Sequence, residues 1–260
     1  MKYLLKNIFF KSANLFAGHP VGKASILMYH SIGYNRAFFT VTPENLEEQL
    51  LYLRSNNFNV ISLSELVNKI KTGADLSHCV SITLDDGYHD NLAHAFPIFE
   101  KYNMPRTYFI ATDPIGRYMN TSDGVSLSIM TEDELKKVSK SSLVEIMPHT
   151  ASHKLLTTYN DDSWKDDIEK SRRFLIERFG SRADIFAYPQ GKFSDKHANY
   201  LKNSGYIAAV TVKEGLVKSR DDTYRLDRNS IDSTTTIDQF AGKLSETIEW
   251  YSKIKRYIRS

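Results

Sequence analysis

The sequence Val80-Ser81-Ile82-Thr83-Leu84-Asp85-Asp86-Gly87 places two adjacent carboxylates directly after a run of β-branched and apolar residues. Such a run is typical of a buried strand, so the acids are expected at its carboxyl end. Taken alone, Asp86-Gly87 has the composition of an ordinary turn. A second polar cluster, His149-Thr150-Ala151-Ser152-His153, follows another apolar segment, residues 143–147. Because both clusters follow predicted strands, they carry more information together than either does alone.

Short apolar runs alternate with segments of helical periodicity over most of the chain. Helix starts are marked by Thr42-Pro43-Glu44 and by the capping boxes Ser62…Glu65 and Thr131…Glu134, and Gly180 marks a helix end. Strands are predicted at residues 25–29, 59–61, 79–84, 106–111, 143–147, 184–188 and 207–212, and helices at 42–56, 62–71, 89–102, 162–179, 194–203 and 237–258. About seven strands alternating with helices predict a mostly parallel sheet covered by helices, in an α/β fold. The longest predicted loop, residues 112–130, has a length often found at functional sites.

The carboxyl ends of parallel strands meet at one edge of a sheet, where the active sites of such folds form. The two clusters would then supply carboxylate and imidazole groups to one site, although chance pairs of histidines four residues apart are common. Three ligands of mixed nitrogen and oxygen type leave a coordination position open, as in a catalytic zinc site. The remaining acid can act as a general base towards water. The pattern therefore indicates a metal-assisted hydrolase.

The composition indicates one soluble globular domain with a substantial core. The chain has 260 residues, of which 41% are hydrophobic and 25% are charged, a length that single α/β barrels commonly reach. A net charge of +3, without a basic stripe interleaved with aromatic residues, argues against nucleic-acid binding. Cys79 is the single cysteine, which excludes an internal disulfide and a cysteine-based zinc cluster. No stretch of the sequence is long and apolar enough to span a membrane.

Both ends of the chain are predicted to be amphipathic helices. Within residues 1–22, apolar side chains recur at helical spacing, whereas Lys6 and Lys11 interrupt any signal-peptide core. This segment either packs on the domain, residues 23–260, or lies on a membrane surface. The spacing of apolar residues predicts one continuous helix over residues 237–258. We expect a cytoplasmic protein, with peripheral contact with the inner membrane as the alternative to simple packing of the first helix.

Four segments of the sequence resemble the motifs of one enzyme family. Thr83-Leu84-Asp85-Asp86-Gly87-Tyr88 resembles the Thr-Phe-Asp-Asp-Gly signature of the polysaccharide deacetylases, the NodB-homology carbohydrate esterases of family 4. His149–His153 is similar to their His-Ser/Thr-x-x-His metal motif, Pro105–Ile110 to the strand after the first motif, and Phe186–Gly191 to a variant of the third motif. The resemblance covers about residues 26–228. It implies a deformed (β/α)7 barrel that uses a divalent metal to remove acetyl groups from N-acetylated sugars.

The resemblance also implies roles for single residues. Asp85 would be the catalytic base, and the backbone N–H of Gln190 would help to bind the oxyanion, with Tyr188 and Pro189 beside it in the substrate-binding segment. The implied ligands of the divalent metal, with Zn²⁺ as the expected ion, are Asp86, His149 and His153.

The sequence departs from the family pattern at two places. Ala187 occupies the position at which many members have an arginine that pairs with the base. Arg228 is a candidate to replace that arginine. The alternative is that Arg228 has only a surface or structural role. The usual late Leu-x-His motif is missing. Ile26-Leu27-Met28-Tyr29-His30 instead resembles the strand that some relatives of the biofilm-polysaccharide deacetylases carry at the N-terminus, as if permuted. His30 is then a candidate general acid, with a structural or substrate-binding histidine as the alternative.

The leading hypothesis is a metal-dependent deacetylase that acts on an N-acetylated sugar of a glycan or lipid-linked precursor, in bacterial surface-polysaccharide biosynthesis. An enzyme that cleaves another small amide on the same fold is the first alternative. A catalytically silent glycan-binding protein is the second, although such a protein would need neither the adjacent acids nor the histidine pair.

Overall fold

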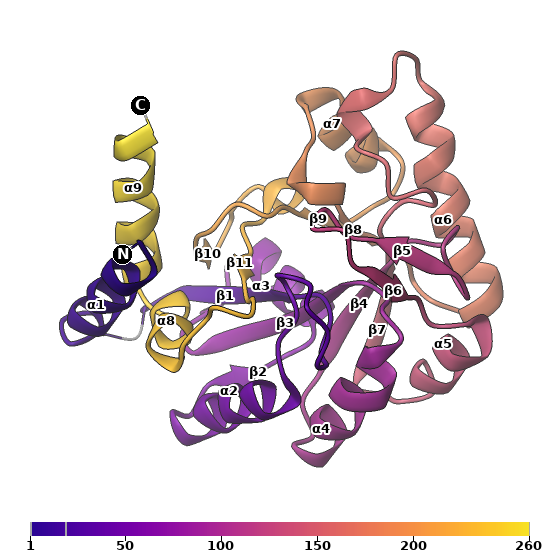
Figure 1. Ribbon diagram of the computed structural model, residues 1–260. Helices are drawn as coiled ribbons and strands as arrows, with labels where there is room; N and C mark the ends of the chain where they lie inside the picture. Colours follow the sequence, from indigo (N-terminus) through magenta and orange to yellow (C-terminus); the bar gives the residue numbers. More distant parts are fainter. Residues whose placement is uncertain (1, 19, 260) are drawn as a thin grey trace.

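The computed structural model describes residues 2–18 and 20–259, with side chains described for residues 6–18, 20–255 and 257. Its centre is a seven-stranded, mostly parallel sheet (Figure 1). Four parallel strands lie in the order β1 (Lys23–Tyr29), β3 (Cys79–Asp86), β4 (Arg106–Ile110) and β7 (Val144–Pro148). The shorter β2 (Asn59–Val60), β10 (Val217–Lys218) and β11 (Asn229–Ser230) pair with β3 or β1, and β10 alone is antiparallel.

A further parallel pair, β8 (Ile185–Ala187) and β9 (Ala208–Val210), forms its own two-stranded sheet. It lies beside β7, because the His149 ring after β7 is hydrogen-bonded to the carbonyl oxygen of Ala187 at the end of β8. The seven strands predicted from the sequence are thus all present, and the α/β fold with a mostly parallel sheet is confirmed. All eight residues of β3 are buried, which explains why this strand is readable as a continuous apolar run.

Helices cover the strands, and their caps lie where the sequence places them. Thr42 accepts a hydrogen bond from the backbone of Asn45 at the start of α2, Thr131 and Glu134 form a reciprocal capping box, and Gly180 ends α6 in a left-handed conformation (φ +61°). The covering helices are α2 (Pro43–Ser55), α3 (Leu63–Thr72), α4 (Phe96–Lys101), α5 (Glu132–Val138), α6 (Ser163–Phe179) and α7 (Asp195–Asn203). The segment predicted as a helix over residues 89–102 begins with a π-helical turn, Asn91–Ala95, before α4.

The segment 112–130, predicted as a loop, contains a small antiparallel hairpin. Its strands are β5 (Tyr118–Asn120) and β6 (Ser126–Ser128). Both are short and largely polar, so they lack the apolar alternation by which strands are recognised in a sequence. The hairpin is joined to the end of β3 by the hydrogen bond from the backbone of Met130 to the carbonyl of Gly87. The loop after β1 reaches the hairpin tip, where the backbone of Phe38 donates to the carboxylate of Asp123.

The prediction of one continuous helix over residues 237–258 is wrong. The structure has two helices, α8 (Ile237–Lys243) and α9 (Thr247–Arg259), separated by a turn in which the Ser245 hydroxyl accepts from the backbone N–H of Thr247. The apolar stripe continues across the break, since Phe240, Leu244 and Ile248 are all buried. Periodicity alone therefore could not reveal the turn. The Ile258 side chain, also part of the predicted stripe, lies outside the described residues.

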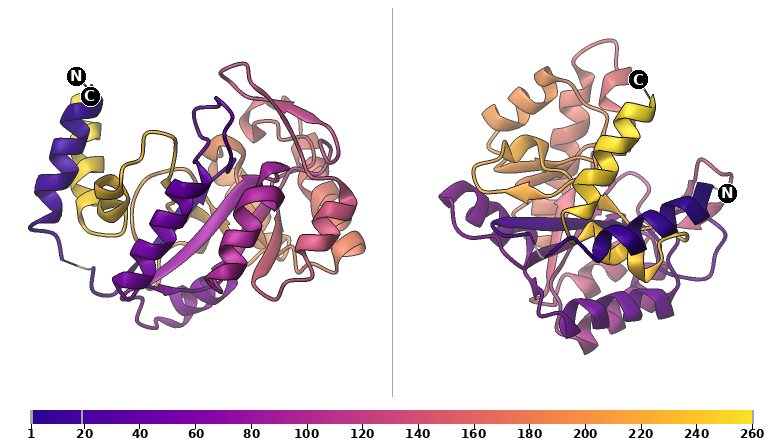
Figure 2. Two further views of the ribbon diagram at one scale, coloured as in Figure 1. Left: turned by 60° about the horizontal axis from the view of Figure 1, so that its bottom comes forward. Right: turned by 90° about the vertical axis from the view of Figure 1, so that its left-hand side faces the viewer.

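Helix α1 (Lys2–Asn14) packs against α8 and α9, and these three helices stand out from one side of the sheet (Figure 1 and Figure 2). Its Phe10 is fully buried and clusters with Leu216 and Ile248. A Cβ at Gly242 would lie 2.1 Å from the Phe10 ring, so α8 meets α1 with no room for a side chain there. The predicted amphipathic helix is thus packed on the domain along one side. The side chains of Lys2, Leu4 and Leu5 lie outside the described residues. No helix in the described part of the chain meets the length and apolarity needed to cross a membrane.

Glu214 links the body of the domain to both C-terminal helices. Its carboxylate accepts from Lys243 of α8 at 2.8 Å and from Lys255 of α9 at 3.2 Å. Burial by itself would raise the pKa of Glu214, but the two ammonium groups outweigh it and lower the pKa to about 2. The Lys243 side chain is almost completely buried, so it depends on this carboxylate for its counter-charge.

We predict that Glu214→Gln lowers the free energy of unfolding at neutral pH by roughly 1–3 kcal/mol, because a buried lysine loses its counter-charge. A carboxylate whose pKa is lower in the folded state stabilises the fold above its ordinary pKa of 4.5, and this contribution is lost as the pH falls towards 2. The difference in Tm between wild type and variant should therefore shrink below about pH 4.5. Glu246→Gln, which removes a more exposed partner of Lys23, is the control and should change little. A Tm difference independent of pH would contradict this account.

Candidate active site

Asp85 and Asp86 end β3, and the backbone turns sharply after them. Asp86 has φ +72° and Gly87 φ +80°. A Cβ added at Gly87 would lie 2.7 Å from Cδ1 of Ile110 on the neighbouring strand β4, so glycine is required for both conformation and space. A left-handed aspartate is uncommon and costs of order 1–3 kcal/mol, a strain that tends to gather at functional sites.

The two histidines follow β7 in a tight loop. The backbone N–H of His149 donates to the carbonyl of Ile110, which ties this residue to the end of β4. Thr150 and His153 both have positive φ, +62° and +60°, and the Thr150 hydroxyl accepts from the backbone of His153. This turn brings the two imidazole rings to a centroid separation of 4.8 Å.

Asp86, His149 and His153 converge on one point. One ligand atom from each lies within 4.8 Å of the other two. Oδ1 of Asp86 is 3.2 Å from Nε2 of His153 and 3.7 Å from Nε2 of His149. Ligands of a tetrahedral zinc ion, at about 2.0–2.1 Å from the metal, are roughly 3.3 Å apart. Moreover, Oδ1 of Asp86 is buried without a hydrogen-bond partner among the described residues. The group therefore fits a divalent cation.

The protonation of His149 agrees with this arrangement. Its Nδ1 lies 2.7 Å from the carbonyl oxygen of Ala187, which can only accept, so Nδ1 carries the proton. Burial, reinforced by His153 and opposed by Asp85 and Asp86, lowers the pKa of His149 to about 4. The ring is therefore neutral at physiological pH, with the lone pair on Nε2 directed to Asp86. The hydrogen bond of a ligating histidine through its other nitrogen is the usual means of fixing its orientation.

Asp85 forms a buried, bidentate ion pair with Arg228. Both contacts between the guanidinium and the carboxylate are 2.7 Å, and two further N–H groups of Arg228 donate to the carbonyl of Thr211 and the hydroxyl of Thr83. Burial by itself would raise the pKa of Asp85, but Arg228 outweighs it and lowers the pKa to about 2. Arg228 is fully buried, not a surface residue. It supplies a cation where Ala187 lacks one.

His30 follows β1 at the same edge. Tyr29 pairs in register with Leu84, so the residue after it lies level with Asp85. The imidazole stacks on Phe39 at 4.9 Å, and its Nδ1 is buried with no hydrogen-bond partner in the described part of the chain. It is close enough to Asp85 to favour the ionised carboxylate. Phe39 also stacks on Tyr88 at 5.5 Å, a contact for which the sequence contains no signal.

The third predicted segment lies beyond the end of β8. Tyr188 is fully buried, stacks on Phe193 at 4.2 Å and donates its hydroxyl to the carbonyl of Tyr224, so its side chain serves packing. Pro189 is buried as well. Gln190 is exposed and left-handed, with φ +51°. Gln190 comes three residues after Ala187, and the carbonyl of Ala187 contacts the His149 ring. The backbone of Gln190 is therefore only a few residues from a contact with the ligand group.

Comparison with known proteins gives consistent results. The family model for polysaccharide deacetylases matches residues 72–209, just over half of the chain. The poly-β-1,6-N-acetyl-D-glucosamine N-deacetylase of Staphylococcus aureus is 26% identical over 81% of this chain and 75% of its own length, and that of Staphylococcus epidermidis is 25% identical over 73% and 67%.

Solved structures show the same fold. The Streptococcus pyogenes deacetylase PplD, determined in complex with acetate, superimposes with a TM-score of 0.75 at 21% identity, covering 85% of this chain and 98% of that one. IcaB from Ammonifex degensii gives 0.73 at 20% identity, covering 86% and 97%. The fold is therefore of the NodB type, as the sequence predicts. The chain belongs to the polysaccharide deacetylase family.

Proposed function

We propose that the protein is a divalent-metal-dependent hydrolase that removes the acetyl group from an N-acetylated sugar of a glycan or glycolipid precursor in bacterial surface-polysaccharide biosynthesis. The observation that carries the proposal is the position of the Asp85–Arg228 ion pair directly beside the Asp86, His149 and His153 group. A charged, oriented carboxylate next to a cation site is what hydrolysis of an unactivated amide requires.

Asp86, His149 and His153 would hold the ion, for which we propose Zn²⁺ because two imidazoles and one carboxylate are typical zinc ligands. Such an ion polarises the amide carbonyl and makes a water molecule more acidic. The protein residues supply the remaining chemistry. Asp85, held in place by Arg228, accepts the proton of the attacking water, and the backbone N–H of Gln190 faces the charge that develops on the carbonyl oxygen.

His30 donates a proton to the departing amine. Its place at the end of β1, level with Asp85 across the strand pair, supports this role. The base and the acid then stand on adjacent strands of one sheet. This separation gives the two protons distinct routes, one leaving the water and one entering the nitrogen.

The substrate is proposed to be an N-acetylglucosamine glycan. The staphylococcal relatives are named for poly-β-1,6-N-acetyl-D-glucosamine. A catalytically silent glycan-binding protein, the second alternative considered from the sequence, would not need a buried bidentate Asp–Arg pair. An amidase for another small amide would use the same groups. Acetate release from a panel of N-acetylated sugars and unrelated amides separates these two enzyme activities.

We predict that His153→Ala weakens Zn²⁺ binding by more than about 100-fold, because a ligand is lost and not merely reoriented. Calorimetric titration of the metal-free protein measures the affinity, and the rise of Tm with added Zn²⁺ provides a readout that needs no substrate. His94→Ala, a histidine on the same edge outside the ligand group, is the matched control. Full metal occupancy in His149→Ala or His153→Ala would show that the ligand assignment is wrong.

We predict that two substrates with different leaving groups distinguish the role of the base, Asp85, from that of the acid, His30. Asp85→Asn should bind Zn²⁺ normally yet release acetate from N-acetylglucosamine about 10²–10⁴-fold more slowly. His30→Ala should be impaired on this amide but nearly unimpaired on p-nitrophenyl acetate, since a nitrophenolate leaves without a proton.

His94→Ala again serves as the control for His30→Ala. Equal losses on both substrates in His30→Ala would assign the histidine to structure or substrate binding. A metal-loaded Asp85→Asn protein with normal turnover would contradict the role of the base.

We further propose that α1 and α9 contact an anionic membrane surface, near a lipid-linked substrate. Beyond the face that buries Phe10 and Ile248, these helices and the turn directly after α1 expose large apolar side chains beside Lys11 and Lys253. Those on α9 are four and three residues apart and share one face. The exposed side chains are Ile8, Leu15, Phe16, Trp250, Ile254 and Tyr257. Apolar residues bordered by lysines suit the boundary between lipid headgroups and acyl chains.

We predict that the full-length protein sediments with vesicles containing anionic lipid at low salt and less so at high salt. Leu15→Ser combined with Phe16→Ser should weaken this partition by about tenfold or more, because two large apolar side chains no longer enter the interface. Zwitterionic vesicles are the control. Protein that remains in the supernatant at low salt would contradict the proposal, and a dimer that the double substitution dissociates would assign the surface to a second copy of the chain.

A further inference from the structure

The ring of the proposed acid, His30, depends on its backbone for its position. His30 comes directly after Tyr29, the last residue of β1, so it lies beyond the paired part of that strand. Nδ1 of the imidazole is buried with no hydrogen-bond partner among the described residues. The ring stacks on Phe39 at 4.9 Å, and a stacking contact permits one ring to slide over the other. The contacts that hold the backbone of His30 therefore set where its imidazole stands.

The backbone of His30 is held by the side chain of Asn91. Nδ2 of Asn91 donates to the carbonyl oxygen of His30 at 2.8 Å, and Asn91 is fully buried. Its Oδ1 is buried with no hydrogen-bond partner in the described part of the chain. A buried amide that is only half satisfied lowers the stability of a fold. Departures of this kind are expected at functional sites.

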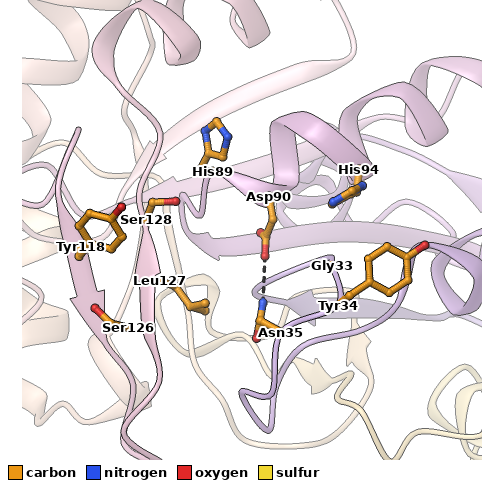
Figure 3. Close-up of a pocket in the computed structure, with 10 residues that line it drawn as sticks. All are labelled: Gly33, Tyr34, Asn35, His89, Asp90, His94, Tyr118, Ser126, Leu127 and Ser128. Carbon is orange, nitrogen blue, oxygen red and sulfur yellow. Dashed lines mark hydrogen bonds between the residues drawn. The ribbon is translucent and has the colours of Figure 1, made fainter.

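The neighbouring residue, Asp90, holds the residue that follows His30. Oδ2 of Asp90 accepts from the Ser31 hydroxyl at 2.5 Å and from Nδ2 of Asn35 at 3.1 Å (Figure 3). A Cβ added at Gly33 would lie 3.1 Å from the same oxygen, so the loop after β1 passes closely over this carboxylate. Two consecutive residues of one turn thus bind two consecutive residues after β1.

Asn91 holds His30 from the side away from the open space. A pocket of about 380 Å³ lies between the loop after β1 and the β5–β6 hairpin, and Asp90, Asn35 and Gly33 line it (Figure 3). Asn91 does not line this pocket. Its amide is therefore placed to act on His30 and not on a ligand.

The turn that begins at Asn91 is π-helical. The backbone N–H of Phe96 donates to the carbonyl of Asn91, five residues back, and Pro97 has no N–H with which to continue an α-helical pattern. Single π-helical turns occur frequently at functional sites. Residues 85–91 thus carry the proposed base, one proposed metal ligand and the group that holds the proposed acid.

We propose that Asn91 is a positioning residue for His30, because its amide fixes the backbone from which the imidazole reaches the departing amine. Asp90 supports it by holding Ser31. The proton comes from His30, and Asn91 transfers none. This inference rests on the proposed deacetylase function and deepens it, since it names the group that sets the distance between the acid and the base.

The test compares two substrates with the full-length, Zn²⁺-loaded protein. Asn91→Ala should lower kcat for acetate release from an N-acetylglucosamine glycan about 10- to 100-fold, the loss that a misplacement of about 1 Å can cause. KM should stay near the wild-type value, because Asn91 does not contact the substrate. Hydrolysis of p-nitrophenyl acetate should be nearly unchanged, since its leaving group needs no proton. Equal losses on both substrates would assign Asn91 to folding in general and overturn the inference.

Two further variants control for an effect on folding. Asn91→Leu keeps most of the side-chain volume without a donor, and it should show the same selective loss on the amide as Asn91→Ala. Asn56→Ala is the matched control, because it also removes an amide that donates to a backbone carbonyl at 2.8 Å, that of Tyr52 in α2. It should leave both activities unchanged.

A double substitution tests whether Asn91 acts through His30. Added to His30→Ala, Asn91→Ala should lower kcat on the amide by less than about twofold, because the group that it positions is already gone. Fully additive losses would show that Asn91 acts independently of His30 and would overturn the inference.

NMR of protein with labelled histidines separates failure of this inference from failure of the proposed function. The His30 signal is the one that His30→Ala removes. It should shift or broaden in Asn91→Ala and stay in place in Asn56→Ala. A displaced His30 signal in a protein that releases no acetate would sustain the positioning contact while removing the deacetylase activity. A His30 signal that Asn91→Ala leaves unchanged would overturn the inference even in an active enzyme.

Discussion

The parallel register of β1, β3, β4 and β7 is the constraint on which the rest of the structure depends. In this arrangement, His30, Asp85 and His149 each come directly after or at the end of a strand. The register sets His30 level with Asp85, and His149 follows two residues beyond that level on β7. Strand pairing itself brings these residues together, without the ordering of long flexible loops. A shift of one residue in β3 would turn Asp85 away from Arg228 and exchange it with Asp86. The hydrophobic burial of both faces of β3 therefore also secures the chemistry.

The site concentrates features that weaken a fold. It contains left-handed Asp86, Thr150 and His153, and a buried ion pair. It also contains a buried carboxylate oxygen that has no hydrogen-bond partner within the described part of the chain. Each is costly away from water or outside the favoured backbone regions. The surrounding strands hold these groups rigidly, since the His149 ring and Arg228 are both anchored by backbone carbonyls. Such an arrangement is expected where cation binding and proton transfer need groups fixed in advance.

The sequence predicted those elements whose formation depends on residues close together in the chain. Strand β3 was predictable because burial on both faces produces a continuous apolar run, and the caps at Thr42, Thr131 and Gly180 act within a few residues. The turn between α8 and α9 was not predictable, because the apolar spacing continues across it. The pairing of Asp85 with Arg228 joins residues 143 positions apart, and the sequence contains one indirect sign of it, the motif departure at Ala187. The pocket between the loop after β1 and the β5–β6 hairpin is formed by segments far apart in the chain, so no periodic pattern in the sequence reveals it.

The separation of Asp85 and Arg228 along the chain has a consequence for folding. Until the segment around residue 228 is in place, β3 would bury a carboxylate that lacks its counter-charge, a state costly enough to disfavour closure of the sheet around it. Docking of the late segment and burial of the acid should thus occur together, as one cooperative step of high contact order. A chain emerging from the ribosome would keep this edge open until the segment around residue 228 has been synthesised. The same ion pair that orients the base would then act as a checkpoint on completion of the native state.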